Sequence, residues 1–190
     1  MKSFHADVME WQQPLENTHA SLVEAMQSMD GVEFDLRLTA DDQLVVHHDH
    51  EVSIPSENLE GRSKLVEEWD LADLEEVGFC SFEKLMSDKE WLVPWQEHSK
   101  VACLEIKRSL PQIEKDVTRR MAKIMQLASE MVDEAGIHQE AVVFYAFHKP
   151  MEKVAKLSGS SRPWSRLLPV VPRTGSHTGK RLRALPQFFT

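Results

Sequence analysis

The segment from Gly31 to Asp49 holds carboxylates and histidines at spacings that can do chemistry. Read as a strand, it places Glu33 and Asp35 on one face, because alternate side chains of a strand point the same way. Two carboxylates at that spacing repel each other when ionised, so a buried pair needs a bound cation. A second apolar run then ends at His47 and His48. The segment predicts a metal site beside a histidine pair, and the plainer alternative is a half-buried strand with a wet acidic face.

Three other short motifs carry polar groups of the same kinds. His5 ends a short strand near the start of the chain, and an acidic-amide-hydroxyl loop at residues 16–18 precedes an amphipathic helix. A later strand ends with Glu105 and Lys107 on one face.

Taken together, these five motifs resemble the glycerophosphodiester phosphodiesterase family in identity, order and approximate spacing. The resemblance covers residues 1–150 well and continues more weakly to about Pro172. It implies an α/β fold of the TIM (β/α)8 type. It also implies a divalent metal, Mg²⁺ or Ca²⁺, held by a Glu-x-Asp pair and by the Glu of a Glu-x-Lys motif.

The resemblance assigns roles to particular residues of this chain. It makes Glu33, Asp35 and Glu105 the metal ligands. It makes His5 and His48 the catalytic acid and base, and it leaves open which of them is the acid. Histidine suits both proton transfers because its ordinary pKa lies close to neutrality.

The binding residues depart from the family pattern at one place. Ala and Asp follow His5, where the family has Arg and Gly, so the arginine that would grip the phosphate is absent. Arg37, two residues beyond the Glu-x-Asp pair on the same strand face, is a candidate substitute for substrate binding. Lys107 is placed to contact the phosphate or to tune the ligand carboxylates, and a solvated surface charge is the alternative.

The remaining polar residues are expected to support this site. Glu16 and Asn17 are predicted to hold the metal ligands or His5 by hydrogen bonds, with a simple helix cap as the alternative. His47 should point away from His48 on a strand, so it is the structural member of the pair.

Hydrophobic periodicity predicts an alternation of strands and helices around these motifs. The predicted strands cover residues 3–5, 32–38, 44–47, 101–107 and 141–147, with a weaker candidate at 164–171. The predicted helices cover residues 18–28, 69–74, 82–86 and 112–135. Buried strands that alternate with helices favour a barrel-like α/β architecture.

The length sets limits on that barrel. A full eight-stranded barrel typically takes about 250 residues, and this chain has 190. The predicted domains are a barrel over residues 1–172, with a small insertion at about 51–99, and a loosely ordered basic tail over 173–190. A truncated gene product, a natural minimal form and completion by a partner copy all remain open. Exposed strand edges would favour a homodimer.

Composition indicates a soluble enzyme rather than a membrane or secreted protein. Hydrophobic residues make up 42% of the chain and charged residues 28%, and no apolar run is long enough to span a membrane. Nothing at Met1 reads as a secretion leader. Cys80 and Cys103 read as reduced thiols, so we expect a cytoplasmic protein.

The net charge of −9 is unevenly distributed along the chain. From Lys149 onward nine basic residues stand against a single acid, Glu152. This basic segment lacks interleaved aromatic residues and contains several prolines and glycines, which favours a loosely ordered or docking tail over a nucleic-acid or membrane contact.

The resemblance implies hydrolysis of a glycerophosphodiester to an alcohol and glycerol 3-phosphate. Two alternatives stay open. One is a catalytically weak or inactive relative that binds phosphate esters or a protein. The other is a phospholipase D-like lyase on the same barrel.

Overall fold

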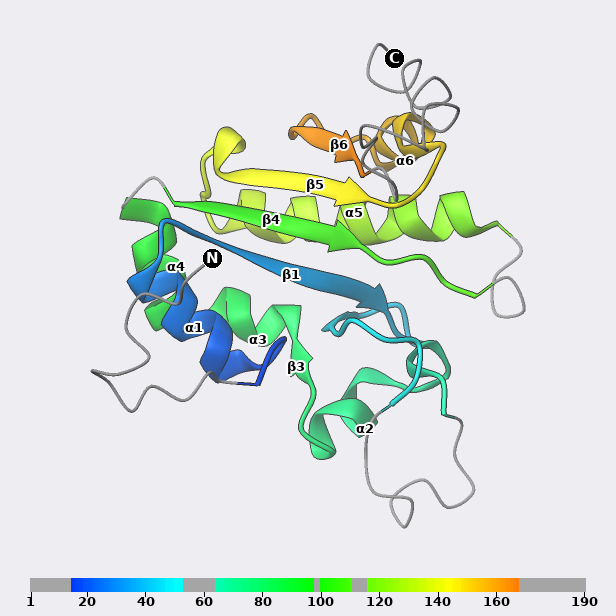
Figure 1. Cartoon of the computed structure of the whole chain (residues 1–190), viewed down its shortest axis with the longest axis horizontal. Coiled ribbons are helices and arrows are strands. Elements are labelled where there is room, and N and C mark those ends of the chain that lie inside the picture. The colour runs from blue at the N-terminus through cyan, green and yellow to red at the C-terminus, as the bar shows by residue number, and fades with distance from the viewer. Residues whose placement is uncertain (1–14, 53–63, 98–99, 111–115, 168–190) are drawn as a thin grey trace, which may run out of the picture.

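A single mixed sheet organises the part of the chain that the structure describes (Figure 1). The structure is a computed structural model, and it describes residues 15–52, 64–97, 100–110 and 116–167. Six strands lie in the order β3-β2-β1-β4-β5-β6. Their bounds are β1 (Gly31–Leu38), β2 (Leu44–Val46), β3 (Cys80–Ser81), β4 (Val101–Ile106), β5 (Val142–Ala146) and β6 (Trp164–Arg166).

Four of these strands run parallel, as expected for an α/β fold. β1, β4, β5 and β6 pair in parallel, whereas β2, beyond β1, pairs antiparallel with both β1 and the edge strand β3. β1 and β4 approach closely at Gly31, where a β-carbon would collide with the carbonyl of Val101. The parallel arrangement sends the ends of β1, β4 and β5 to one edge of the sheet, where a binding site is expected in such folds.

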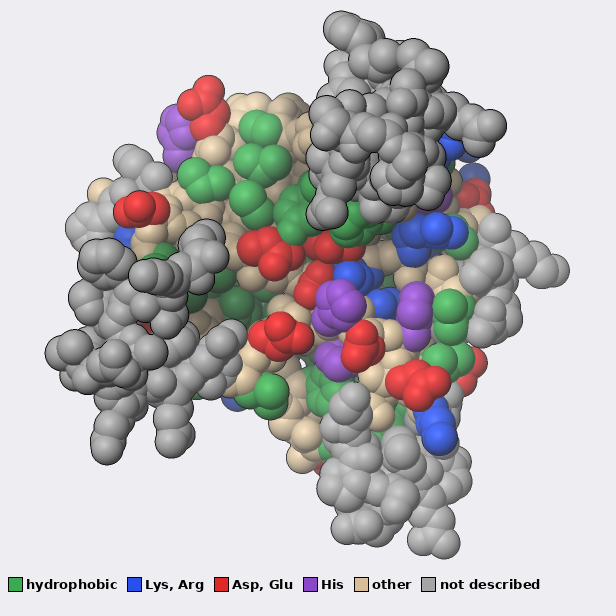
Figure 2. All heavy atoms as spheres, viewed as in Figure 1, with side chains coloured by type: hydrophobic (Ala, Val, Ile, Leu, Met, Phe, Trp, Pro, Cys, Tyr) green, Lys and Arg blue, Asp and Glu red, His purple; other side chains and the backbone are tan. Residues whose placement is uncertain are grey.

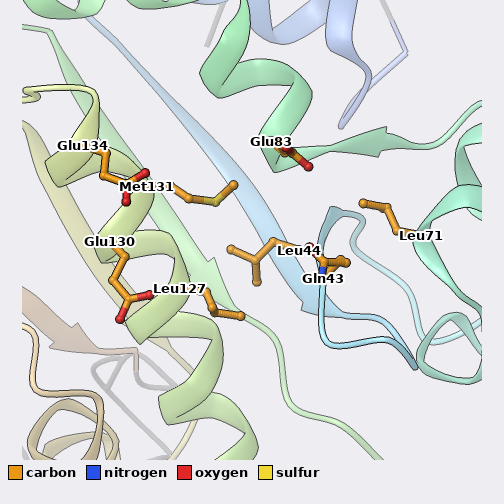
Figure 3. Close-up of a pocket in the computed structure, with 8 residues that line it drawn as sticks. All are labelled: Gln43, Leu44, Leu71, Glu83, Leu127, Glu130, Met131 and Glu134. Atoms are coloured by element: carbon orange, nitrogen blue, oxygen red, sulfur yellow. The ribbon is translucent and has the colours of Figure 1, made fainter.

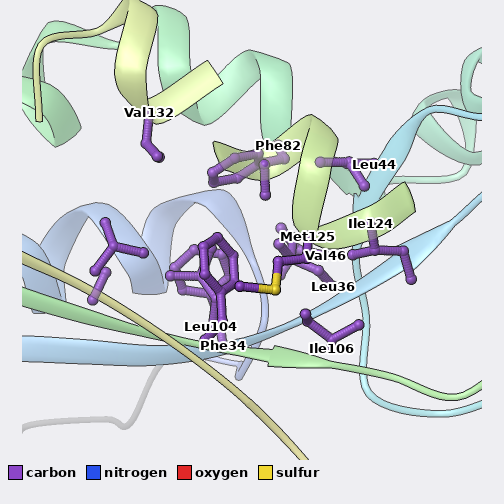
Figure 4. Packing of buried hydrophobic residues seen from close by; sticks show 14 of the residues in the cluster. Phe34, Leu36, Leu44, Val46, Phe82, Leu104, Ile106, Ile124, Met125 and Val132 are labelled. Atoms are coloured by element: carbon purple, nitrogen blue, oxygen red, sulfur yellow. The ribbon is translucent and has the colours of Figure 1, made fainter. Parts of the chain in front are cut away.

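Helices cover one face of the sheet. Their bounds are α1 (His19–Ser28), α3 (Phe82–Ser87), α4 (Lys89–Glu97), α5 (Val117–Glu134) and α6 (Met151–Ser158). Phe34 and Leu36 of β1 and Leu104 of β4 point into this core, where they meet α5 side chains such as Met125 (Figure 4). The aromatic ring of Phe34 lies 5.7 Å from that of Trp91 and 5.9 Å from that of Phe82, measured between ring centroids. Trp91 and Trp95 are both fully buried.

A second, smaller apolar cluster lies beside β2. It contains residues of α2 (Leu71–Glu76) and of the 3-10 helix Val66–Glu68, and it packs on Val45 and Val52. A further 3-10 helix spans Gln139–Ala141. The boundaries predicted for the insertion and for the tail remain predictions, because residues 53–63 and 168–190 lie outside the described part.

Most predicted elements are confirmed within one or two residues. The helix predicted at 18–28 and the strands at 32–38 and 101–107 are all present. The long helix predicted over 112–135 is α5, which begins later, at Val117, after its cap Asp116. The run at 44–47 is the hairpin partner of β1. The candidate strand at 164–171 is described only as the short β6, and the strand expected at 3–5 lies outside the described residues.

No helix in the described ranges combines the length and the apolar character needed to cross a membrane.

Candidate metal centre

The carboxylates predicted to bind metal meet on the open face of the sheet. Asp35 of β1, Glu105 of β4 and Tyr145 of β5 are partners in register, so their side chains form one row across three strands. Glu33 precedes Asp35 by two residues and therefore lies on the same face. One carboxylate oxygen from each of Glu33, Asp35 and Glu105 lies within 4.8 Å of the others. We call these three residues the carboxylate triad.

Burial sets this triad apart from an ordinary acidic strand face. Asp35 and Glu105 are only 5% and 9% exposed, whereas Glu33 remains open to solvent. The alternative of a wet acidic face is therefore wrong for the first two. Burial raises the pKa of Glu33 above its ordinary 4.5, and the neighbouring carboxylates of Asp35 and Glu105 act in the same direction. The site concentrates negative charge that a cation would relieve.

Lys107 offsets part of that charge. Its ammonium nitrogen lies 3.2 Å from Asp35 Oδ1 and 3.0 Å from Glu105 Oε1, so it joins two members of the triad. Its side chain is 12% exposed, which excludes the alternative of a freely solvated surface charge. The triad still exceeds it by two negative charges when fully ionised. Its donors are hard carboxylate oxygens, the ligands that Mg²⁺ and Ca²⁺ prefer, so these residues fit a divalent cation.

Asn17 supports the triad from the loop before α1. Its side-chain amide donates to Asp35 Oδ2 at 3.0 Å, and its side-chain oxygen accepts from the backbone N–H of Asp35 at 3.4 Å. Its backbone has a φ of 55°, a left-handed conformation that asparagine tolerates better than most residues. Thr18, in a capping box with Ser21, is the residue that caps α1. The helix-cap alternative is therefore wrong for Asn17, which contacts a predicted metal ligand.

Tyr145 is a site residue that the sequence analysis missed. Its hydroxyl donates a very short hydrogen bond to Glu33 Oε1. Burial, followed by this contact with Glu33, raises the pKa of Tyr145 above its ordinary 10, so the phenol keeps its proton and acts as the donor. In the sequence, Tyr145 reads as one more residue of an apolar strand. Its place beside the triad follows only from the register of β5 against β4, which pairs it with Glu105.

The two adjacent histidines point in different directions, as predicted. The His47 ring packs against that of Phe79, with centroids 4.8 Å apart and planes tilted by 60°, and its Nε2 lies 3.0 Å from the carbonyl of Glu51. Burial lowers the pKa of His47 below its ordinary 6.5. His48 is instead 58% exposed, and its Nδ1 lies 2.7 Å from Asp49 Oδ1. That contact orients the ring and leaves Nε2 for other partners.

Arg37 does not take the place predicted for it. Its guanidinium is 2% exposed, pairs with Glu67 at 2.6 Å and donates to the backbone carbonyl of His48 at 2.6 Å. It also donates to the carbonyl of Arg108. Because Glu67 and two carbonyls already satisfy this buried group, Arg37 is not free to bind a substrate. It holds the backbone that carries His48.

A hollow of about 460 Å³ lies between the carboxylate triad and His48. It is lined by the carboxylate triad together with Glu16, Asn17, His48, Tyr145, Phe147 and Leu167. Figure 2 shows acidic, basic and histidine side chains gathered on this face, toward the ends of β1 and β4. Glu16 thus lines the hollow, and the hydrogen bonds predicted for it to the metal ligands or to His5 stay a prediction. His5 lies outside the described residues, and its role remains a prediction.

Three glutamates also line a smaller hollow on the helix side of the sheet, of about 140 Å³ (Figure 3). Glu130 and Glu134 belong to α5 and Glu83 to α3. Glu130 accepts a hydrogen bond from Gln126. Among the described residues, the carboxylate triad is the one group whose ligand atoms lie close enough together for a single ion.

Comparison with known proteins agrees with this geometry. The sequence model of the glycerophosphoryl diester phosphodiesterase family matches residues 5–152. This chain belongs to that family. No protein of curated function matches the chain.

Solved structures of glycerophosphodiester phosphodiesterases share its fold. A putative family enzyme from Silicibacter pomeroyi gives a TM-score of 0.61 at 19% identity, over 80% of this chain and 60% of that one. The enzyme from Thermotoga maritima gives 0.54 at 17% identity, over 92% and 65%. A phosphodiesterase from Oleispira antarctica, solved with its product sn-glycerol-3-phosphate, gives 0.57 at 21% identity, over 92% and 68%.

These likenesses confirm the predicted α/β fold of the TIM-barrel type. The chain spans about 60 to 68% of the length of these family structures.

Proposed function

We propose that this chain is a metal-dependent phosphodiesterase that hydrolyses glycerophosphodiesters to an alcohol and glycerol 3-phosphate. The observation that carries the proposal is the carboxylate triad, whose oxygens lie within 4.8 Å of one another in a hollow that His48 also lines. The family match and the product bound to the Oleispira antarctica relative support the same substrate class.

In this proposal Glu33, Asp35 and Glu105 hold the divalent cation, Mg²⁺ or Ca²⁺. The bound cation supplies positive charge that offsets the negative charge of the phosphodiester and of its transition state. Lys107, which bridges two of the ligands, adds a fixed ammonium where the phosphate would lie. The cation and Lys107 would thus hold an anionic substrate in a site whose own carboxylates would otherwise repel it.

Proton transfer falls to the predicted pair of histidines. His48 is held by Asp49 at Nδ1, so its Nε2 is the atom that exchanges a proton with the substrate or water. His5 is proposed as the other member, one histidine activating the nucleophile and the other protonating the leaving alcohol. Arg37 keeps the backbone of His48 in place through a 2.6 Å hydrogen bond.

The cellular location and the oligomeric state are also proposals. Both cysteines are free thiols, which supports the predicted cytoplasmic location. A homodimer, and a barrel over residues 1–172 with an insertion and a basic tail, remain proposals. Size-exclusion chromatography that shows a monomer at low concentration would count against the dimer.

The test uses the purified full chain with glycerophosphocholine and either Mg²⁺ or Ca²⁺, with products followed by phosphorus NMR. We expect glycerol 3-phosphate in the wild type, and little in Glu33→Ala or His48→Ala. Glu134→Gln, in the separate hollow of Figure 3, is the matched control and should keep its activity. Absence of product with both metals, or activity in both site variants equal to that of the wild type, would overturn the proposal. Binding without turnover would indicate the inactive relative instead.

A further inference from the structure

Tyr145 reaches across the sheet to one particular atom of the carboxylate triad. It starts from β5, in register with Glu105, and its hydroxyl donates to Glu33 Oε1 on β1, two strands away. The phenol therefore closes the β5 side of the triad and fixes the rotation of the Glu33 carboxylate. Of the two Glu33 oxygens, Oε2 has no described protein donor and is the one left for a ligand.

The other two carboxylates are also restricted by fixed neighbours. Asp35 Oδ2 accepts from Asn17, and Asp35 Oδ1 lies beside the Lys107 ammonium. Glu105 Oε1 pairs with the same ammonium at 3.0 Å. Each carboxylate of the triad thus has at least one oxygen already engaged by a neighbouring side chain. In a bidentate contact both oxygens of one carboxylate face the same ion. An oxygen that already contacts a fixed neighbour is less available for such a contact.

The two candidate cations differ in how they use carboxylates. Ca²⁺ takes six to eight oxygens in flexible geometry and often binds a carboxylate through both of its oxygens. Mg²⁺ is smaller, takes six ligands and keeps several waters, so single oxygens from a few carboxylates suffice. A triad in which each carboxylate has at least one oxygen already engaged matches the second pattern.

We propose that Tyr145 is a positioning residue that makes the triad select Mg²⁺ over Ca²⁺, by holding Glu33 in a single-oxygen binding mode. The inference rests on the proposed function, in which the triad holds a divalent cation. It commits to one metal where family membership leaves two. Tyr145 acts through Glu33 and needs no contact with the metal or the substrate.

Tyr145→Phe tests the inference, because it removes the hydroxyl and keeps the ring. Mg²⁺ and Ca²⁺ affinities of the full chain are measured by calorimetry in the wild type and the variant. We expect the wild type to prefer Mg²⁺ and the variant to shift the ratio of the two affinities toward Ca²⁺ by about tenfold, the scale on which residues behind a metal ligand act. A residue with a merely structural role would lower both affinities together and leave their ratio unchanged.

Ser81→Ala is the matched control. Ser81 also donates its hydroxyl to a glutamate, Glu75, at 2.6 Å, but it does not line the hollow of the triad. Its loss should leave the ratio of affinities unchanged. Thermal unfolding of both variants checks that each one folds.

A second readout uses the fact that the chain has a single tyrosine. Full-chain protein that incorporates 3-fluorotyrosine should give one fluorine NMR signal, which should move with Mg²⁺ and saturate at the calorimetric affinity. An unchanged affinity ratio in Tyr145→Phe, a wild-type preference for Ca²⁺, or a fluorine signal indifferent to Mg²⁺ would overturn the inference alone. Failure of the wild type to bind either cation would overturn the proposed function as well.

Discussion

The two faces of β1 show how one strand serves both stability and chemistry. Phe34 and Leu36 point to the helices and are fully buried. Asp35 points the other way and is 5% exposed, so burial alone does not separate the faces. They differ in what covers them: aromatic and aliphatic side chains on one, and Lys107, Asn17 and Glu105 on the other. A variant on one face should therefore lose stability, and a variant on the other should lose function.

The largest effect is expected on the polar face. Asp35→Asn removes one carboxylate charge of the triad while keeping the shape of the side chain. If the triad holds the cation as proposed, phosphodiesterase kcat should fall by about 10³-fold, or about 4 kcal/mol. Because the substitution also relieves repulsion within the triad, the free energy of unfolding should stay the same or rise by about 1 kcal/mol. Steady-state kinetics and urea unfolding measure the two effects. A large loss of stability would contradict the division between the faces.

On the apolar face, Phe34→Ala should destabilise the fold. The ring contacts Phe82 and Trp91 in the core, so its removal leaves a cavity that costs about 3–5 kcal/mol. Urea unfolding measures this loss. The fraction that remains folded should still bind Mg²⁺ with unchanged affinity, and a changed affinity would show that the two faces are coupled.

Arg37 is an exception to this division between the faces, since it lies on the polar face but has a structural role. Glu67→Gln removes the charge that pairs with its buried guanidinium and should lower the free energy of unfolding by about 2 kcal/mol. Chemical denaturation provides the measurement. If stability does not change, Arg37 is not held by this pair, and its role as a substrate residue reopens.

The smallest effect concerns the histidine that faces away from the site. Burial lowers the pKa of His47 in the folded chain, so the unfolded chain binds its proton more tightly. The free energy of unfolding should therefore fall as the pH falls through 6.5 toward the lower pKa of the folded state. Urea unfolding at about pH 7.5 and 5.5 measures that fall, and it should be smaller in His47→Gln. Burial lowers the pKa of His50 and His148 in the same direction, so some of the fall should remain. An identical fall in the variant would exclude His47 as a contributor.

Much of this arrangement could be predicted from the sequence, because it depends on local periodicity. The alternation in β1 and the spacing of α5 identify their buried faces directly, and the Glu-x-Asp and Glu-x-Lys motifs identify the triad. α4 was missed because Pro94 within it reads as a helix breaker. α6 was missed because its eight residues follow Pro150 without a polar capping contact.

The misses at the site have a different cause, because they depend on contacts between distant segments. The partner of Arg37 is Glu67, which lies 30 residues later. Glu67 belongs to a 3-10 helix of three residues, which is too short to show a hydrophobic periodicity in the sequence. The position of Tyr145 beside the triad follows only from the register of β5 against β4. A sequence therefore locates ligands that belong to a motif more readily than the residues that hold those ligands.

The claim that the carboxylate triad holds a divalent cation can be checked by calorimetric titration of the full chain with Mg²⁺. We predict one saturable site in the wild type, its loss in Glu105→Gln, and its retention in Glu134→Gln from the other three-glutamate hollow. Equal Mg²⁺ binding by Glu105→Gln and the wild type would contradict the claim.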